Sequence, residues 1–442
     1  MEKLPREFNT LIIGLGPQGL AVLANAVENP KFAGIVNDGL FAVERNTPGH
    51  TWSIDCMYSD TTLQSSTFKD LTFLANPKSE FSFFNFLHKK GKLCSFIVPG
   101  DSILTRQLFF EYLQDVAKNL KKHIAQHTEV TKIEEIKDAT SNVRAFKVEL
   151  KNAHYTYYVF VKNIILSSEF GKPVLPAIFD QSDLLKQNFI FHPRGIQKHL
   201  LEISKRNNNA PTIIVVGSGQ SAGESINIVA RIPNAHVISI TRSPFFSNKD
   251  SNPFINRIFQ PEYVDEFFAL NENERIERLN FDKREHSKGM NPLLVKEISK
   301  LKQLGKIQVK FTSEITNIQK INDETIEITI NNKEKIHCNA IISATGYEIE
   351  RFPKLLKSIR SMRLDDKNSL IINRDYSLKT NSNSAVSVFL IGAATIFSHG
   401  LASGELTILP FIANDILTKL KSSNKQPNSL FTIKIVRELK TK

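Results

Sequence analysis

Apolar runs that lead through a glycine turn into a helical segment occur twice in the chain. The first run covers 10–13 and precedes an Ala/Leu-rich helix over 20–26; the next apolar run, 41–44, ends on an acid. A second run covers 211–216 and again enters a helix. Strands that alternate with helices in this way are typical of α/β folds. The pattern predicts two Rossmann-like α/β domains.

Each unit is followed by a hairpin and a further apolar strand. Alternating stretches between 146 and 161 predict a hairpin, and a separate short strand is expected over 163–167. The same order recurs between 325 and 343. A last apolar strand over 386–392 delivers the chain to Ser398-His399-Gly400-Leu401, and we expect a final helix from there through Leu417.

The first glycine turn fits a dinucleotide site. Gly14 allows the backbone angles of the turn, Gly16 lets a pyrophosphate approach the main chain, and Gly19 allows close packing of helix on strand. The phosphates would lie at the helix N-terminus. Glu44, at the end of the next strand, would accept the ribose hydroxyls of an adenosine. A single turn of this kind also occurs in unrelated α/β domains, but the strand, helix and acid around it favour the dinucleotide site.

The second turn is built of small and polar residues, namely Gly217, Ser218, Gly219, Gln220 and Ser221. Two such turns, each followed by a hairpin and a strand, indicate a flavoprotein that binds FAD at one site and a nicotinamide cofactor at the other. The strand after the second turn ends in Arg242, where an NAD enzyme has an acid. A guanidinium there would bind the 2′-phosphate of NADPH. The alternative is a surface arginine.

This order of elements predicts the domain organisation. We expect residues 1–175 to form the first part of an FAD-binding domain and residues 176–345 an NADPH-binding domain. An insertion over about 243–303, with a charged helical run at 271–281, would form a small helical substrate-binding region. Residues 346–421 would return to the FAD and substrate site, and the polar, basic tail over 422–442 would fray.

Composition narrows the classes of function. The 442 residues are enough for two or three domains, and the 41% hydrophobic and 23% charged content is that of a globular protein. No apolar run approaches a membrane span, and the polar start of the chain does not resemble a signal sequence, so the cytoplasm is expected. Cys56, Cys94 and Cys338 are far apart and are expected to be packing residues. The net charge of +12 is spread along the chain, which disfavours nucleic acid as a partner.

Together these residues resemble the N-hydroxylating flavin monooxygenases of siderophore biosynthesis, which act on lysine, ornithine or diamines. The resemblance covers nearly the whole chain. Its specific stretches are Gly14-Leu15-Gly16-Pro17, Leu63-Gln64, Phe68-Lys69-Asp70-Leu71, residues 77–87, Asn252-Pro253-Phe254-Ile255-Asn256, Ala344-Thr345-Gly346-Tyr347 and His399-Gly400-Leu401.

The resemblance implies roles for individual residues. Lys69 would bind the α-carboxylate of an amino-acid substrate, and Asn256 would hydrogen-bond the substrate backbone. The alternatives are an ion pair of Lys69 with Asp70 or a neighbour, and a helix cap at Asn256. Further cofactor-binding positions are implied at Pro17, Trp52, Gln64, Gln220, Arg242, Thr345 and Leu401.

The resemblance also implies the chemistry. NADPH would reduce FAD, O₂ would add to the flavin as a C4a-hydroperoxide, and the neutral terminal amine of the substrate would attack it to give a hydroxylamine. The protein would position the reactants and exclude water, without a metal or a catalytic acid-base pair. The family suggests a homo-oligomer. A flavin monooxygenase acting on sulfur, carbon or ketones and a catalytically degenerate flavoprotein scaffold are the alternatives.

One departure from the family bears on the substrate. After His399-Gly400-Leu401 this chain continues with Ala402-Ser403-Gly404-Glu405, which places a carboxylate at an apolar family position near the flavin. Glu405 would pair with a substrate ammonium if it lies at the pocket, which would favour a diamine or an unusual amine. The alternative is a solvated helix residue.

Overall fold

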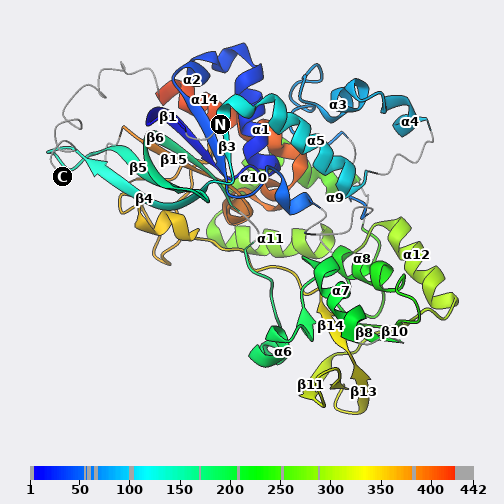
Figure 1. Ribbon diagram of the computed structural model, residues 1–442. Coiled ribbons are helices and arrows are strands. Elements are labelled where there is room, and N and C mark those ends of the chain that lie inside the picture. The colour runs from blue at the N-terminus through cyan, green and yellow to red at the C-terminus, as the bar shows by residue number, and fades with distance from the viewer. Residues whose placement is uncertain are drawn as a thin grey trace.

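The computed structural model describes residues 4–53, 56, 61–63, 68–98, 104–168, 171–206, 210–249, 253–286, 289–380 and 385–423. Figure 1 shows two bodies, one formed around the blue and cyan strands and the other around the green and yellow ones. Gln64, Asn252 and the tail from 424 lie outside the described residues. Within the described residues, no helix is long and apolar enough to cross a membrane.

The sheet of the first body has the order β3-β2-β1-β6-β5-β4, with β15 also paired to β6. Its strands are β1 (Glu7–Ile13), β2 (Leu40–Glu44), β3 (Ile124–Gln126), β4 (Glu129–Lys137), β5 (Val143–Lys151), β6 (Thr156–Ser168) and β15 (Ser387–Gly392). The short strand expected at 163–167 is wrong as a separate element. Strand β6 runs unbroken because its first half pairs with β5 and its second half pairs in parallel with β15.

The second body holds a parallel sheet in the order β10-β9-β8-β14-β7. Its strands are β7 (Ile190–Phe191), β8 (Thr212–Val216), β9 (His236–Ile240), β10 (Ile307–Lys310) and β14 (Ala340–Ser343). A small antiparallel sheet of β11 (Ile315–Lys320), β12 (Ile326–Ile330) and β13 (Glu334–Cys338) accompanies it. The two Rossmann-like units predicted from the glycine turns are therefore present.

Helices cover the sheets on the faces that their apolar side chains require. The first body carries α1 (Pro17–Glu28), α2 (Ala33–Asn37), α3 (Phe83–Lys89), α4 (Leu93–Ile97), α5 (Arg106–Asn119), α13 (Ile396–His399) and α14 (Leu409–Ser423). The second carries α6 (Ser182–Lys186), α7 (Ile196–Arg206), α8 (Gln220–Val229) and α12 (Pro292–Gln303). Helix α1 packs along α14, which joins the start of the described chain to its end.

The inserted region divides between the two bodies. It holds the helices α9 (Pro253–Asn256), α10 (Pro261–Ala269) and α11 (Glu272–His286). Phe259, in the turn after α9, and Phe267, on α10, belong to the core of the first body. Helix α12 packs on α8, and Leu294 belongs to the core of the second body. In Figure 1, α11 lies along the border between the bodies. The insertion therefore links them.

The final helix differs from its prediction. The chain from Ile396 forms the short helix α13, then two single turns, η8 (Leu401–Gly404) and η9 (Leu406–Ile408), before α14 begins at Leu409. Gly400 has a φ of +82° and Glu405 is extended, so neither continues a helix. Pro410 lies in the first turn of α14, where proline favours a helix start. The expected helix N-terminus at Leu401 is therefore wrong.

The cysteines are free. Cys56 and Cys338 are buried, as expected of packing residues, but Cys94 is exposed on α4. The expectation that all three are packing residues is wrong for Cys94. Burial raises the pKa of the Cys338 thiol to about 12, so this side chain stays protonated at neutral pH.

Candidate active site

The first glycine turn joins β1 to α1 as the sequence predicts. Gly14 has a φ of +90°, and its N–H donates to the Val43 carbonyl at 2.9 Å. A Cβ on Gly19 would lie 2.1 Å from the Gly14 carbonyl oxygen, so the helix approaches the turn as closely as only glycine permits. Gly16 caps α1 without a side-chain hydrogen bond, and a Cβ there would meet nothing within 4 Å. Open space therefore lies before the helix N-terminus.

Glu44 fastens this turn to the end of β2. Its Oε2 accepts the Leu15 N–H at 2.8 Å, and its Oε1 accepts the Asn46 N–H at 2.9 Å. Each carboxylate oxygen has acceptor capacity left after one bond. Glu44 thus lies at the turn, as its spacing predicts, and it also holds the turn in place.

The second turn repeats this geometry. The Gly217 N–H donates to the Ile240 carbonyl at 3.1 Å, and a Cβ on Gly217 would lie 2.5 Å from the Ala344 carbonyl oxygen. Gly219 caps α8 without a side-chain bond and also faces open space. Ser218 and Ser243 place their hydroxyls 3.1 Å apart. The exposed Arg242 precedes Ser243 directly and therefore lies beside the turn.

Gln220, the first residue of α8, is tied to two protein groups. Its Nε2 donates to Glu224 at 2.7 Å, and its Oε1 accepts the Asn291 N–H at 2.8 Å. Ser221 follows it on the same first turn of α8. A dinucleotide that bound the Gln220 amide would have to compete with these two bonds.

Thr345 lies in the connection that returns the chain to the first body. Its hydroxyl is 2.8 Å from Ser343 Oγ and donates to the Val174 carbonyl. The Val174 N–H donates to the Gly346 carbonyl at 2.9 Å, so the outgoing and returning connections pair with one another. Tyr347 meets the His192 ring edge-on at 4.6 Å. Burial, reinforced by Arg194, lowers the pKa of His192 to about 4, which keeps this ring neutral.

Trp52 is held between an aromatic ring and a cation. Its ring lies 4.8 Å from Phe109, and the Arg106 guanidinium lies 4.8 Å from its centroid. Arg106 donates to the Thr51 carbonyl at 2.6 Å, while its Nε is buried and has no hydrogen-bond partner within the described ranges. Burial lowers the pKa of Arg106. The sequence analysis assigned no role to Arg106. Its position at the start of α5 is the sole sequence feature that could have drawn attention to it.

The segment before α3 is anchored by buried and surface carboxylates. Asp70 is 1% exposed; its Oδ1 accepts the N–H groups of Thr72 at 2.8 Å and Phe73 at 2.7 Å, and its Oδ2 accepts that of Phe83 at 2.6 Å. Burial raises the pKa of Asp70, and these three bonds oppose the rise. The alternative ion pair of Asp70 with Lys69 is absent from the described residues, because the backbone occupies the carboxylate.

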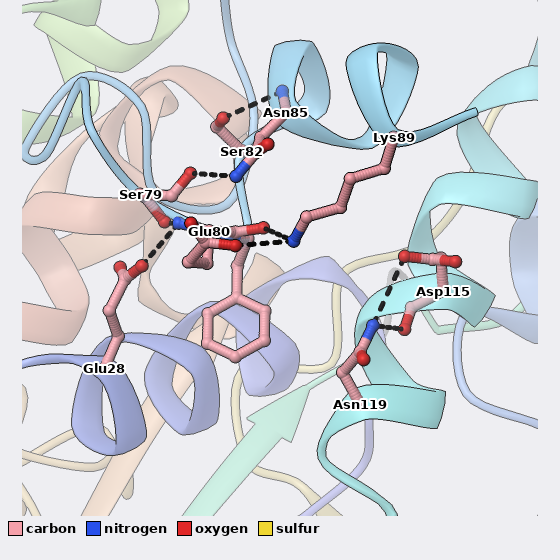
Figure 2. Close-up of polar contacts among 9 residues, drawn as sticks. Glu28, Ser79, Glu80, Ser82, Asn85, Lys89, Asp115 and Asn119 are labelled. Carbon is pink, nitrogen blue, oxygen red and sulfur yellow. Dashed lines mark hydrogen bonds and ion pairs between the residues drawn. The ribbon is translucent and has the colours of Figure 1, made fainter. Parts of the chain in front are cut away.

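Figure 2 shows the outer anchor of the same segment. Glu28, at the end of α1, accepts the Glu80 N–H at 2.5 Å, and Lys89 on α3 reaches the Glu80 carboxylate at 2.6 Å. Ser82 caps α3 by accepting the Asn85 N–H at 3.2 Å. The polypeptide that follows Lys69, from Asp70 to Ser82, is therefore fixed to α1 and α3.

Lys69 projects from this anchored segment toward the insertion. Its Nζ lies 4.4 Å from the centre of the Phe259 ring, a cation–π distance, and Phe259 is buried. Burial lowers the pKa of Lys69; Glu405 raises it, and Lys249 lowers it. The structure therefore brings Lys69 and Glu405 into one region, with Lys249, which sequence reasoning did not single out.

Asn256 ends α9, three residues before Phe259. Its side chain makes no capping hydrogen bond to the turn that follows, Arg257–Phe259, which excludes the helix-cap alternative. That turn packs against η8, which carries the buried Leu401. Gln18, inside the first glycine turn, donates to the Ser403 carbonyl at 3.2 Å. The region around Lys69 and Asn256 is thus connected to the first glycine turn.

Residues 6–349 match the protein family described as L-lysine 6-monooxygenase/L-ornithine 5-monooxygenase. The chain belongs to this family. An L-ornithine N(5)-monooxygenase from Pseudomonas aeruginosa is 27% identical, with 91% of each chain covered. The solved ornithine hydroxylase of the same organism is 26% identical, with a TM-score of 0.81 over 94% of this chain and 99% of that one. An ornithine N-hydroxylase from Kutzneria sp. 744, solved with reduced FAD, NADP⁺ and L-ornithine, is 22% identical; its TM-score is 0.80 over 94% of this chain and 99% of that one.

Family membership confirms the resemblance drawn from the sequence motifs. Two side chains beside Lys69 were missed by sequence reasoning. Lys249 lies in a stretch without periodicity, and Phe259 is one of 31 phenylalanines, so no sequence signal distinguished either. The carboxylate of Glu405 is the charge in this region that departs from the family motif.

Proposed function

We propose that this protein hydroxylates the terminal amine of lysine, ornithine or a related amine, with FAD and NADPH as cofactors, and that the product serves hydroxamate siderophore synthesis. The observation that carries the proposal is the half-buried ammonium of Lys69, held over Phe259 in the region that Gln18 connects to the first glycine turn. A half-buried cation without an ion pair in the described chain is suited to a substrate carboxylate.

The glycine turns fit the two dinucleotides. Gly16 and Gly219 both begin helices of at least ten residues without a side-chain cap and with open space in front. Free N–H groups at such a helix end suit a pyrophosphate. We propose that the turn with Glu44 holds FAD and that the turn beside Arg242 holds NADPH. The FAD-binding domain would then comprise 1–175 and 346–421, and the NADPH-binding domain 176–345.

Bound FAD, once reduced by NADPH, would supply the activation of O₂ for transfer of one oxygen atom to the amine. The residues of the chain contribute binding and orientation. Lys69 and Asn256 would hold the far end of the substrate, so that its neutral terminal amine reaches the flavin. Leu401 and Phe259 would exclude water from that region, since both are buried.

The test measures cofactor and product together. The purified protein should retain FAD, and NADPH oxidation with lysine, ornithine, putrescine or cadaverine should yield hydroxylamine. Retained FAD with no hydroxylamine from any of these amines would refute the proposal. Activity on sulfides or ketones without any amine would point to the other flavin monooxygenase reactions.

Replacement of the lysine tests the role of its charge. Lys69→Ala should raise KM for an amino acid by roughly 10- to 100-fold, because a charge-assisted contact contributes about 1.5 to 3 kcal/mol. A diamine, which has no carboxylate, should be nearly unaffected. Lys78→Ala, at an exposed lysine of the same segment, is the matched control. An unchanged KM for every amine would exclude this role of Lys69.

A further inference from the structure

We propose that Glu405 makes this enzyme selective for α-amino acids, by accepting the α-ammonium of the substrate while Lys69 binds its carboxylate. The inference rests on the proposed function and names the substrate class for the same site. Glu405 would then bind the α-ammonium, a cationic group that Lys69 cannot bind.

Glu405 and Lys69 lie on neighbouring segments of the first body. Glu405 follows η8 directly, and η8 packs against the turn that carries Phe259 beneath Lys69. Glu405 raises the pKa of Lys69, but no ion pair joins the two side chains in the described structure. Neither charge is therefore neutralised by direct contact with the other, and both remain available to a bound substrate. The head of an α-amino acid, with an ammonium and a carboxylate on one carbon, matches that arrangement.

The surroundings of Glu405 also favour a bound cation. Leu401, Ser403 and Leu406 are buried, and Glu405 itself is half-buried and extended, with its N–H donating to the Ala402 carbonyl at 2.9 Å. Its carboxylate accepts no hydrogen bond from the described residues. A carboxylate in such surroundings gains from a cationic partner. A freely solvated helix residue, the alternative from the sequence, does not describe this position.

Lys249 adds a positive charge to this region and lowers the pKa of Lys69. Lys249 is held by its N–H bond to the Met290 carbonyl at 2.7 Å. The close approach of Lys249 to this segment requires a glycine at position 289. Gly289 has a φ of +111°, and a Cβ there would lie 2.7 Å from the Lys249 nitrogen. Lys69 and Lys249 favour a substrate group that carries a carboxylate, and Glu405 favours an ammonium beside it. A diamine would bring a cation to two cations and would be bound less well.

Three classes of amine separate these contributions. Ornithine and lysine carry both charges, 5-aminovalerate and 6-aminohexanoate carry the carboxylate alone, and putrescine and cadaverine carry the second ammonium alone. The FAD-loaded protein should bind the amino acids most tightly, both in calorimetry and in KM. A wild-type protein that prefers diamines or ω-amino acids would overturn the inference.

Substitution of Glu405 gives the sharper result. Glu405→Gln should weaken binding of the amino acids by about 10- to 100-fold, as expected for loss of one charge-assisted contact, and should leave the ω-amino acids unchanged or improved. Glu405→Asp should restore part of the loss. Glu277→Gln, at an exposed glutamate of α11, is the matched control. Equal losses for all three classes, or no loss for the amino acids, would refute the role.

The calorimetry separates this inference from the proposed function. Amino-acid binding that depends on Glu405, without hydroxylamine formation, would support the inference and refute the proposed reaction. Hydroxylamine formation with no dependence on Glu405 would support the proposed reaction and refute the inference. Failure to bind any of the amines would overturn both.

Discussion

Asp70→Asn should destabilise the protein and impair amine binding together. Asp70 accepts three backbone N–H groups, and an asparagine has only one acceptor oxygen. If that oxygen keeps the bonds to Thr72 and Phe73, the asparagine NH₂ faces the Phe83 N–H at a distance now 2.6 Å, donor against donor. An unsatisfied buried donor costs about 1 to 3 kcal/mol, and the two remaining bonds lose their charge assistance. Relief of the burial cost of the carboxylate offsets part of this loss, so a net loss of about 2 to 4 kcal/mol is expected.

The loss should appear as a melting temperature lower by roughly 5 to 15 °C for the FAD-loaded protein, since about 1 kcal/mol shifts a domain of this size by about 2 to 4 °C. KM for the amino acid should rise as well, because Lys69 adjoins the anchored carboxylate. Asp180→Asn, at an exposed aspartate, controls for the change of charge. An unchanged melting temperature would refute the assigned hydrogen bonds. A lowered melting temperature with unchanged KM would show that this anchor does not position Lys69.

Two further changes test the glycine turn and a buried histidine. Gly19→Ala should release FAD and lower the melting temperature, because the alanine Cβ would lie 2.1 Å from a main-chain oxygen. Flavin absorbance after gel filtration measures the retained FAD. A variant that keeps FAD would contradict the close approach of helix and turn. Burial lowers the pKa of His399 from 6.5 to about 3. Between these pH values the unfolded chain binds a proton that the folded chain does not. The free energy of unfolding therefore decreases by up to about 1.4 kcal/mol for each pH unit of acidification. His399→Gln should be less stable at pH 7, because contacts to Ser398 at 2.8 Å and to the Tyr376 ring at 4.0 Å are lost, and should show a flatter acid limb in denaturant titrations between pH 6.5 and 5. An equal slope in both proteins would refute the buried neutral ring.

The repeated units could be predicted from sequence because local signals coincide there. An apolar strand, a glycine that tolerates a positive φ and an Ala-rich helix all point to one structure at Gly14, and again at Gly217. The sequence pattern divides strand β6 in two, because the alternation of apolar and polar residues cannot reveal its pairing with β15. Strand β15 lies more than 200 residues further along the chain. The sequence predicts too early a start for the final helix, because the backbone geometry at Gly400 and Glu405 that interrupts the helix is not visible in the residue pattern.

The site was predictable where a motif carries it. Lys69 and Asn256 could be named because the stretches around them are specific to a family, although composition alone says nothing of their roles. Their neighbours could not be named. Phe259 and Lys249 reach Lys69 only through the fold of the insertion, and long-range packing of this kind leaves no periodic signal in the sequence.

The divided insertion connects the second glycine turn to the region around Lys69. Helices α10 and α11 belong to the core of the first body, whereas Met290 and α12 belong to that of the second. Lys249 is bonded to Met290, and the next residue, Asn291, donates to Gln220 in the second glycine turn. A movement of the second body relative to the first would therefore displace Lys249 together with the second glycine turn. The charges around Lys69 are thus complete only in an arrangement of the two bodies that keeps Lys249 near Lys69.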